Sequence, residues 1–564
     1  MKMKISISKW TKSGSPWVWL NAGAVAISVI MVVCLIGLIA VRGLAHFWPA
    51  DVIQATYVEK GNRSTVIGEI VQIEQVSATQ LRDAGIKVAP GIDSLERKLL
   101  KTGNRDIGGI DFSWALARDL SDVKTPPMLF TAERYEWGNL YGFLRSLKQG
   151  DTVVNEYTGY DKSRQYMGLW QQLDKSLLRA QGIRDKILNI EKDQIGSINH
   201  QFERLRLKER SMKLNGIADI SVSADMARQS EELAAQYKVL EDKLVSLYSE
   251  INRDSISVEV STGAVIDVPV ANLVRIFRAN DMNQFNKAVH YAEKLWEFVS
   301  EDPREANTEG GIFPAIFGTV MMVILMSIMV TPFGVVAAVY LSEYAKQGFL
   351  TRLIRIAVNN LAGVPSIVYG VFGLGFFVYL LGGSIDQLFY PEALPSPTFG
   401  TGGLLWASIT LALLTVPVVI VATEEGLSRI PSALKEGSLA LGATKAETLF
   451  KIILPMTSPA MMTGVILAIA RAAGEVAPLM LVGVVKLAPT LPLNMNYPYL
   501  HLDQKIMHLG FHIYDVGFQS PNVEAARPLV YATAFLLILV IALLNLSAVA
   551  IRNRLREKYK ALEM

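Results

Sequence analysis

The chain has 564 residues, of which 51% are hydrophobic and 19% are charged, and its formal net charge is +3. This length allows several domains, and the apolar fraction indicates a protein that is partly embedded in a membrane and partly aqueous. The small net charge gives no indication of a nucleic-acid partner, and the single cysteine, Cys34, excludes intrachain disulfides and multi-cysteine metal sites.

An apolar run, Trp17–Ala40, follows four lysines near the N-terminus. It is long enough to span a bilayer, which takes about 20 residues. A cleaved signal peptide is the alternative, but the run is longer than the apolar core of a typical signal sequence, and no clear small-residue cleavage site follows it. Residues 1–40 are therefore predicted to form a short tail and an uncleaved membrane anchor.

Residues 41–310 are aqueous in character and are predicted to form an inserted α+β domain. The expected strands are Ser64–Val76, Ser255–Val260 and Ala264–Val268. The expected helices are two long polar ones, Ser163–Asn215 and Ala224–Asn252, and a last one at Asn283–Ser300.

Apolar residues of the second long helix recur at a step of seven and then at alternating steps of four and three, which is the spacing of a heptad seam. Asn215-Gly216 lies in the break between the two long helices, so we expect an antiparallel helical hairpin. The seam is interpreted as packing within the hairpin, in preference to a zipper that binds a partner. Its residues are Met226, Leu233, Tyr237, Leu240, Leu244, Leu247 and Ile251.

Five further apolar runs occupy residues 311–551, which makes six membrane spans with the N-terminal anchor. The predicted fold class is therefore an all-α polytopic membrane protein with an inserted extracytoplasmic domain. The third span is expected to be broken at Gly363-Val364-Pro365. The five runs are Ile312–Leu341, Leu350–Leu381, Leu404–Ala422, Met456–Val485 and Leu529–Ile551.

The distribution of lysine and arginine predicts the orientation, because these residues are enriched in cytoplasmic loops. They precede the first span and follow the second, fourth and sixth, whereas the loop at 382–403 contains none. Both termini, including the basic tail 552–564, and the loop at about 424–455 are therefore predicted to be cytoplasmic. Residues 41–310 are predicted to be extracytoplasmic, and periplasmic in a cell with an outer membrane.

The cytoplasmic segment 432–455 is predicted to form a helical hairpin. Ser432–Leu441 is a short amphipathic helix that ends at Gly442, and a capping box with Thr444 at its N-cap opens the second helix. Leu454-Pro455 is expected to mark the turn into the membrane. A hairpin of this kind either docks in a groove of another protein or lies on the lipid surface, and the residues alone leave both interpretations open.

The spacing of five residues in this hairpin resembles the EAA motif of ABC importer permeases: Glu436, then Gly442, then Ile452, Leu454 and Pro455. Gly437 and Ser438 stand where that family usually has two alanines, and both replacements are small. In that family the hairpin is the coupling helix that docks into a separate ATPase subunit. The resemblance therefore implies an ATPase-coupling surface formed by Glu436, Gly442, Ala443, Thr444, Ile452, Leu454 and Pro455.

Three further stretches, Thr331–Tyr344, Leu361–Gly370 and Ala470–Leu479, resemble the phosphate permeases of this family, the PstA subunits. The resemblance implies a type I ABC importer permease core at 311–551 in the bacterial inner membrane. It also implies three protein partners: a PstB-like ATPase, a second, PstC-like permease subunit and a periplasmic, PstS-like phosphate-binding protein. Residues 41–310 lie outside the shared core, and the resemblance does not extend to their role.

Arg471 and Glu475 lie four residues apart inside the run Met456–Val485, the fifth predicted span, and so on one face of a helix. Each is unfavourable alone near the membrane interior. They either neutralise each other or line a substrate path, where the planar donor fork of Arg471 suits a phosphate oxyanion. Phosphate near neutral pH keeps a proton that it can donate to Glu475, whereas sulfate has none. The pair therefore favours phosphate over sulfate, and the phosphate-permease resemblance points to the same positions.

Asn359 and Asn360, near the start of the third span, are further candidates for the substrate path. Three histidines, His501, His508 and His512, lie between the fifth and sixth spans. Two of them have i, i+4 spacing but lack a suitably placed acid, so an amphipathic surface helix is expected there and a metal site is not.

The chain contains no GxxxxGK[ST] sequence, so it is not expected to hydrolyse ATP, and neither a catalytic residue nor a cofactor is expected. The expected function is that of a membrane-spanning permease subunit of a phosphate importer that a partner ATPase drives. A permease for another oxyanion, such as sulfate or molybdate, is the first alternative. The second is a membrane-anchored coiled-coil sensor or a polysaccharide chain-length regulator, which the four additional spans and the EAA-like spacing disfavour.

Overall fold

The computed structural model describes residues 14–59, 62–86, 88–157, 159, 164–216, 220–488, 490–520 and 523–559. The four N-terminal lysines and Lys560, which supported the predicted orientation, lie outside these ranges. Within them, six helices are long and apolar enough to cross a membrane. They are Trp17–Phe47, Phe313–Tyr344, Ser366–Phe389, Leu404–Ser428, Lys445–Ala472 and Ala526–Glu557.

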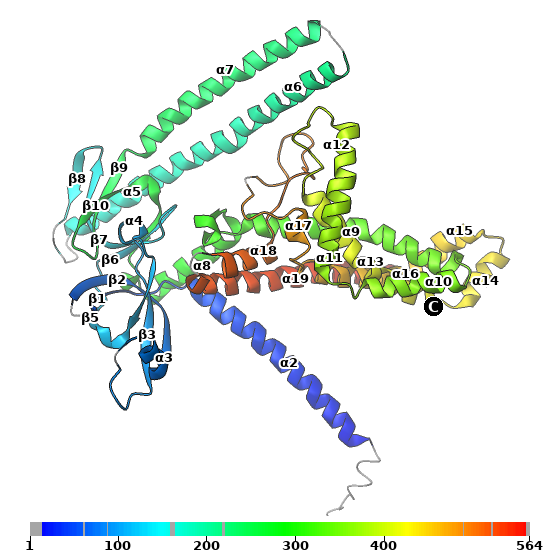
Figure 1. The fold of residues 1–564 in the computed structure, drawn as a ribbon, viewed down its shortest axis with the longest axis horizontal. Coiled ribbons are helices and arrows are strands. Elements are labelled where there is room, and N and C mark those ends of the chain that lie inside the picture. The colour runs from blue at the N-terminus through cyan, green and yellow to red at the C-terminus, as the bar shows by residue number, and fades with distance from the viewer. Residues whose placement is uncertain are drawn as a thin grey trace, which may run out of the picture.

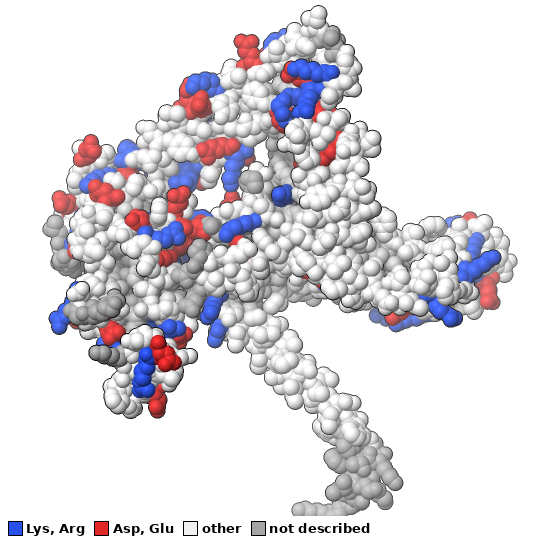
Figure 2. Space-filling view, in the orientation of Figure 1, with Lys and Arg blue, Asp and Glu red and all other residues white. Residues whose placement is uncertain are grey.

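The helices of the C-terminal half form an elongated bundle, with the two sheets at one end and the short helices α14 (Ser432–Ala440) and α15 (Lys445–Thr448) at the other (Figure 1). Charged side chains gather on the sheets, on the long helical hairpin and at the α14–α15 end, while the surface between them is largely uncharged (Figure 2). An uncharged band between two charged ends is what a membrane-spanning bundle requires.

Two antiparallel sheets account for the strands of the inserted domain apart from one short two-stranded pair, and they confirm the three predicted strands as β2, β9 and β10. The first sheet has the order β4-β3-β2-β1-β5, and the second has the order β10-β9-β7-β6-β11 with β8 paired to β7. The first comprises β1 (Val52–Glu59), β2 (Asn62–Ser77), β3 (Ser94–Lys101), β4 (Phe112–Leu116) and β5 (Leu120–Lys124). The second comprises β6 (Leu129–Arg134), β7 (Leu140–Gln149), β8 (Thr152–Glu156), β9 (Asp254–Glu259), β10 (Val265–Pro269) and β11 (Leu273–Phe277).

The predicted helical hairpin is confirmed. Helix α5 (Arg164–Leu188), a π-helical turn and α6 (Gly196–Leu214) follow one another without a break, and α7 (Ile220–Ile251) returns beside them (Figure 1). Most of the heptad seam packs inside the hairpin and against the second sheet, which confirms the internal-packing interpretation. Tyr237 is the exception, since 37% of its surface remains exposed.

Helix α8 (Gln284–Ser300) begins where predicted, because the Asn283 side chain accepts a hydrogen bond from the Asn286 backbone nitrogen at 2.8 Å. A strap, defined here as residues 303–310, then leads to α9 (Phe313–Val339). Its ends pair as the short strands β12 (Pro303–Arg304) and β13 (Glu309–Gly310). The strap therefore joins the domain directly to the first helix of the C-terminal bundle.

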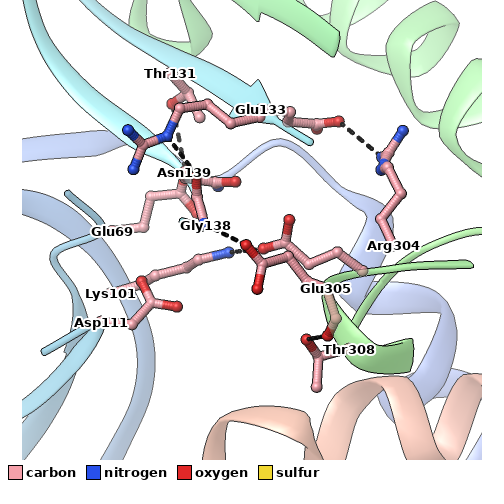
Figure 3. A network of polar contacts seen from close by, with 12 residues as sticks. Glu69, Lys101, Asp111, Thr131, Glu133, Gly138, Asn139, Arg304, Glu305 and Thr308 are labelled. Atoms are coloured by element: carbon pink, nitrogen blue, oxygen red, sulfur yellow. Dashed lines mark hydrogen bonds and ion pairs between the residues drawn. The ribbon is translucent and has the colours of Figure 1, made fainter. Parts of the chain in front are cut away.

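Two acidic side chains fasten this strap to the first sheet and its loops and to the loop between β6 and β7 of the second sheet (Figure 3). Glu305 pairs with Arg105 at 2.7 Å and accepts a hydrogen bond from the Gly138 backbone nitrogen at 3.1 Å. Glu309 lies 3.4 Å from Lys101. Burial opposes the charge on Lys101, but the carboxylates of Glu309 and of neighbouring acids raise its pKa above the usual value.

A second cluster of charges ties α8 and the strap to the second sheet. Lys294 lies 2.8 Å from Glu133 and 3.0 Å from Glu297, and Arg304 of the strap lies 2.6 Å from Glu297. Burial opposes ionisation of Glu133, but Lys294 and the nearby arginines lower its pKa to about 2. These buried, charge-assisted contacts make the domain and the start of α9 one connected unit.

The first membrane helix, α2 (Ser15–Leu44), stands apart from the bundle over most of its length (Figure 1). The apolar stretch at its centre has no buried residues. It meets α19 (Val523–Tyr559) at Gly43, where a Cβ atom would lie 2.5 Å from the Ala532 backbone nitrogen. The glycine permits this close approach at the C-terminal end of α2 and leaves the rest of the helix with an apolar surface suited to lipid.

The predicted third span, Leu350–Leu381, is wrong in extent. The break at Gly363-Val364-Pro365 is confirmed, but it separates α10 (Phe349–Leu361) from a membrane span that begins only at Ser366. The span consists of α11 (Ser366–Phe372), a π-helical segment and α12 (Gly383–Phe389). Helix α10 is amphipathic and carries two arginines, so its apolar residues form one face and do not make a bilayer-spanning core.

Candidate functional site

The candidate path lies beside α13 (Leu404–Ser428), the central helix of the bundle, which packs between α9 and α16 (Leu454–Ala472). Small residues allow the close approach on both sides. A Cβ at Gly334 of α9 would lie 2.6 Å from a methyl carbon of Val419, and one at Gly464 of α16 would lie 2.8 Å from the Ala422 Cβ. These contacts fix α16 against α13 and so fix the wall of the cavity beside them.

A cavity of about 530 Å³ opens between α10, α13 and α16. Its wall is mostly apolar, with a few polar groups from each of the three helices, which is the composition of many small-ligand sites. The predicted residue Asn359 lines it, whereas Asn360 does not. The lining residues are Asn359, Ala362, Pro417, Val418, Val421, Ala422, Glu425, Gly426, Arg429, Ala460, Thr463 and Leu467.

Arg471 lies in the last turn of α16, beyond this cavity, whereas Glu475 follows the end of that helix at Ala472. The expectation that both residues lie on one face of a helix is therefore wrong, because the chain leaves the helix between them. Arg471 follows the lining residue Leu467 by one turn on the same helix face. Its Nε atom lies 3.6 Å from Glu475 Oε1, which is too long for a hydrogen bond. The Nε atom is buried and has no hydrogen-bond partner among the described residues. The two side chains therefore attract each other without closing into a bidentate pair, and the guanidinium keeps donors for another anion.

The hairpin at the opposite end of α16 has the predicted caps. The Thr444 hydroxyl accepts from the Glu447 backbone nitrogen at 3.2 Å, and Glu447 accepts from the Thr444 backbone nitrogen at 3.0 Å. Gly442 has φ +86°, a left-handed conformation that favours glycine. The Ser438 and Thr448 hydroxyls lie 2.8 Å apart in a buried hydrogen bond that joins the two helices. The turn is therefore rigid.

The motif residues of the hairpin divide into two groups. Glu436, Gly442 and Thr444 are exposed, and Ala443 is half-buried, around the turn. Ile452, Leu454 and Pro455 are half-buried where the second helix enters the bundle. Lys435 pairs with Glu343, and Lys445 donates to the Glu343 backbone oxygen, so the π-helical turn that continues α9 (Tyr340–Tyr344) supports the hairpin from the side.

The expected turn at Leu454-Pro455 is wrong. Helix α15, a π-helical turn at Leu449–Ile453 and α16 form a continuous helix, and Pro455 sits in the first turn of α16. The π-helical turn accommodates the proline, which has no backbone N–H to donate. The predicted span Met456–Val485 is also wrong in extent, because the membrane helix is Lys445–Ala472. A single helix thus connects the hairpin to Arg471.

The residues after Ala472 fold back against the bundle and include α17 (Leu479–Val482) and α18 (Leu509–Tyr514). The expected surface helix with exposed histidines is wrong, since His501, His508 and His512 are all buried. His508 caps α18 by accepting from the Gly510 backbone nitrogen at 3.1 Å. Burial lowers the pKa of both His508 and His512 to about 4, so they are neutral at pH 7. No metal-binding cluster of three acidic, histidine or cysteine side chains occurs among the described residues.

Sequence reasoning missed several polar residues of the cavity, among them Thr463, Glu425 and Arg429. Thr463 and Leu467 precede Arg471 by eight and four residues and so lie on the same helix face. Counting back from Arg471 in steps of four would therefore have identified both as cavity-lining residues. Arg429 lies 3.7 Å from Glu425 on α13, a pair with i, i+4 spacing.

Comparisons with known proteins cover the C-terminal half of the chain. Residues 330–557 match the family of binding-protein-dependent transport system inner membrane components. The chain is 34% identical over 245 residues to the phosphate transport system permease protein PstA 1 of Mycobacterium tuberculosis H37Rv, covering 43% of this chain and 70% of that protein. It is 32% identical over 251 residues to the PstA protein of Yersinia pestis, covering 44% of this chain and 75% of that protein.

A further relative is the probable phosphate transport system permease protein PstA of Methanocaldococcus jannaschii. It is 31% identical over 255 residues, which cover 45% of this chain and 79% of that protein. Among solved structures, the inward-facing MetNI methionine ABC transporter is 17% identical with a TM-score of 0.32, covering 47% of this chain and 98% of that chain.

Proposed function

The chain belongs to the binding-protein-dependent transport system inner membrane components, in the PstA family of permeases, and we propose that it is a permease subunit of an ATP-driven phosphate importer. The observation that carries the proposal is the Arg471 guanidinium, which lies near the end of an apolar helix and whose Nε atom donates no hydrogen bond within the described part of the chain. An incompletely paired guanidinium beside a membrane cavity suits a passing oxyanion. Family membership removes the sensor and chain-length-regulator alternatives.

ATP hydrolysis in this proposal belongs to a separate ATPase subunit, which docks on the 432–455 hairpin. The continuous helix from α15 through α16 supports this role, because it links the hairpin to Arg471 along one element, with a π-helical turn at Leu449–Ile453 and Pro459 within it. A second permease subunit completes the path across the cavity, and a periplasmic binding protein delivers phosphate. The membrane helices would then switch the side of the membrane that the Arg471 region faces.

The proposed orientation puts the hairpin and both termini in the cytoplasm and the inserted domain outside it, in the bacterial inner membrane. The distribution of basic residues supports this orientation. So does the position of α14 and α15, which lie at the opposite end of the bundle from the two sheets (Figure 1). The last described residues of α19 lie at the hairpin end of the bundle (Figure 1). A protease added to sealed spheroplasts is expected to cleave the inserted domain but not the hairpin.

Asn359→Leu is expected to lower the phosphate uptake rate about fivefold, because the substitution removes one polar contact from the cavity wall while keeping a similar side-chain volume. Labelled-phosphate uptake into proteoliposomes containing the complete complex measures the change. Asn360→Leu is the matched control, because the Asn360 side chain is next in sequence but does not line the cavity. The uptake rate of this variant should stay within about twofold of the wild-type rate. Equal losses in the two variants would contradict a role for the cavity.

Glu475→Gln is expected to make sulfate a stronger competitor of phosphate uptake. The sulfate concentration that halves phosphate uptake is expected to fall about tenfold. The carboxylate repels a fully ionised anion and only accepts hydrogen bonds, whereas the amide is neutral and also donates. The measurement is labelled-phosphate uptake against increasing sulfate. An unchanged response to sulfate would show that Glu475 does not select the anion, and the permease for another oxyanion would regain support.

A further inference from the structure

The segment that follows Arg471 forms a small lobe, defined here as residues 490–501. Within it, the His501 ring nitrogen Nε2 lies 3.0 Å from Asn494 Oδ1, and the His501 backbone nitrogen donates to the Pro492 oxygen at 2.7 Å. A bridge pairs Leu493 with Leu500 in antiparallel fashion. The lobe is therefore a folded unit that can move as one body.

The base of this lobe is attached to the helices that carry the candidate path. The backbone nitrogen of Val485 donates to the Ile506 oxygen at 3.0 Å, and that of Gly403, just before α13, donates to the Val482 oxygen at 2.9 Å. Helix α17 also packs against α11, where a Cβ at Gly370 would lie 2.6 Å from the Pro478 Cα. A displacement of the lobe would therefore be felt by α11 and by α13, which lines the candidate path.

The inserted domain contacts this part of the bundle at two places, and the first is buried. Asn307 of the strap is 2% exposed. Its side-chain nitrogen donates to the Lys486 backbone oxygen at 2.9 Å and to Asp515 at 3.3 Å. Lys486 in turn lies 3.2 Å from Asp515. With the apolar cluster that includes Phe298 and the start of α18, this contact is a fixed joint.

The second contact is small, polar and exposed, and it comes from the opposite end of the domain. His200 of α6 has a ring nitrogen 3.0 Å from the Tyr497 backbone oxygen, and its ring centroid lies 6.1 Å from that of His501. One helical turn later, the Arg204 guanidinium carbon lies 5.9 Å from the centre of the Tyr497 ring. Figure 1 shows the hairpin of α6 and α7 extending over the bundle, where the lobe rises toward it.

The two contacts differ in how readily they open. The joint at Asn307 would leave buried polar groups without partners if it separated. If the contact of His200 and Arg204 with Tyr497 separated, water would replace one hydrogen bond and one cation–π contact. Tyr497 is already 66% exposed. The hairpin therefore holds the lobe through a contact that can break and re-form while the domain stays attached.

We propose that His200 and Arg204 are positioning residues for transport, which latch the 490–501 lobe to the inserted domain and release it once in each transport cycle. The proposal rests on the proposed importer function. It gives the helical hairpin a role inside the permease subunit itself, as a latch on the segment that continues from Arg471 and Glu475. The latch acts through the lobe and touches no substrate.

Crosslinking between Arg204→Cys and Tyr497→Cys tests the latch, in a chain where the single native cysteine is removed by Cys34→Ala. The reagent is a bifunctional maleimide whose spacer contains a cleavable disulfide. In the complete complex, crosslinking is expected to lower phosphate uptake about tenfold relative to the uncrosslinked double variant, and reductant is expected to return uptake to the level of that variant. The crosslinking yield is expected to fall severalfold when the partner ATPases are trapped with ATP and vanadate.

A matched control places the same crosslink inside the hairpin. Tyr248 donates a hydrogen bond to Glu191 at 2.6 Å, so Glu191→Cys with Tyr248→Cys bridges two helices of the hairpin without touching the lobe. Its crosslink is expected to leave uptake unchanged and to form equally in both nucleotide states.

Two results would overturn the latch: full uptake after complete Arg204–Tyr497 crosslinking, or the same crosslinking yield with and without vanadate. The proposed importer function is tested separately by phosphate uptake of the uncrosslinked complex. If that complex took up no phosphate, the substrate assignment would fall, and the dependence of the crosslinking yield on nucleotide would still decide the latch.

Discussion

Arg471→Ala is expected to reduce phosphate uptake by at least about a hundredfold, the loss typical of a missing charged donor at a site that stabilises an anion. The ion pair with Glu475 spans 3.6 Å, and the buried Nε atom has no hydrogen-bond partner among the described residues. Removal of the guanidinium leaves the Glu475 carboxylate without this ion pair, and the carboxylate repels an anion. Labelled-phosphate uptake into vesicles containing the complete complex measures the loss.

The alternative to this role is a pair that only neutralises itself. In that case Arg471→Ala would unbalance the charge and lower stability, while Arg471→Ala combined with Glu475→Gln would restore both folding and uptake. If Arg471 instead lines the substrate path, the variant that combines Arg471→Ala with Glu475→Gln is expected to fold and still to fail in transport. Co-purification of the ATPase subunit and thermal stability in detergent report folding. Arg554→Ala, on the exposed end of α19, is the control that should transport normally.

Elements whose signals are local in sequence were predicted well. The capping box at Thr444 and the turn at Gly442 depend on a few neighbouring residues, and both are present. The heptad seam specified a helical hairpin, because a regular apolar stripe on a long polar helix must be covered. The break at Gly363-Val364-Pro365 was also recognised, since proline and glycine act on the backbone directly.

Predictions failed where three-dimensional context decided the outcome. Leu454-Pro455 was interpreted as a turn, but proline is tolerated in the first turn of a helix, and the preceding π-helical turn absorbs the change. The histidines near 508 were expected on a surface, yet the backbone after Ala472 folds back and buries them. The cavity itself could not be predicted, because α10, α13 and α16 come from distant parts of the chain.

The contacts of His200 and Arg204 with Tyr497 illustrate the same limit. These residues are about 300 positions apart, and each is an ordinary polar or aromatic residue on an element whose local structure gives no hint of the other. Sequence patterning placed the hairpin and the lobe in separate units. Only the geometry of the strap and the two sheets, which directs α6 back over the bundle, brings them together (Figure 1).

The second large expected effect concerns the turn of the cytoplasmic hairpin. Leu441 is 91% exposed at the tip, and Phe450 is 69% exposed on the second helix, although both are large and apolar. Exposed apolar residues on a rigid turn are typical anchors for a groove on another protein. Leu441→Asp is expected to weaken association with the ATPase subunit about a hundredfold and to abolish uptake, because it places a charge where the proposed groove would bury an apolar side chain.

The point substitution tests this better than deletion of residues 432–453, because Leu449 and Ile453 pack with Leu427 and Val339 in the bundle, and their loss would disturb folding. Lys451→Gln is the control, since this exposed side chain makes, among the described residues, a surface pair with Glu447 at 3.5 Å and no other ion pair. Co-purification and phosphate-dependent ATP hydrolysis are measured for both variants. If Leu441→Asp bound and drove the ATPase normally, the hairpin would be a lipid-surface element, and the continuous helix from α15 to Arg471 would have no input to transmit.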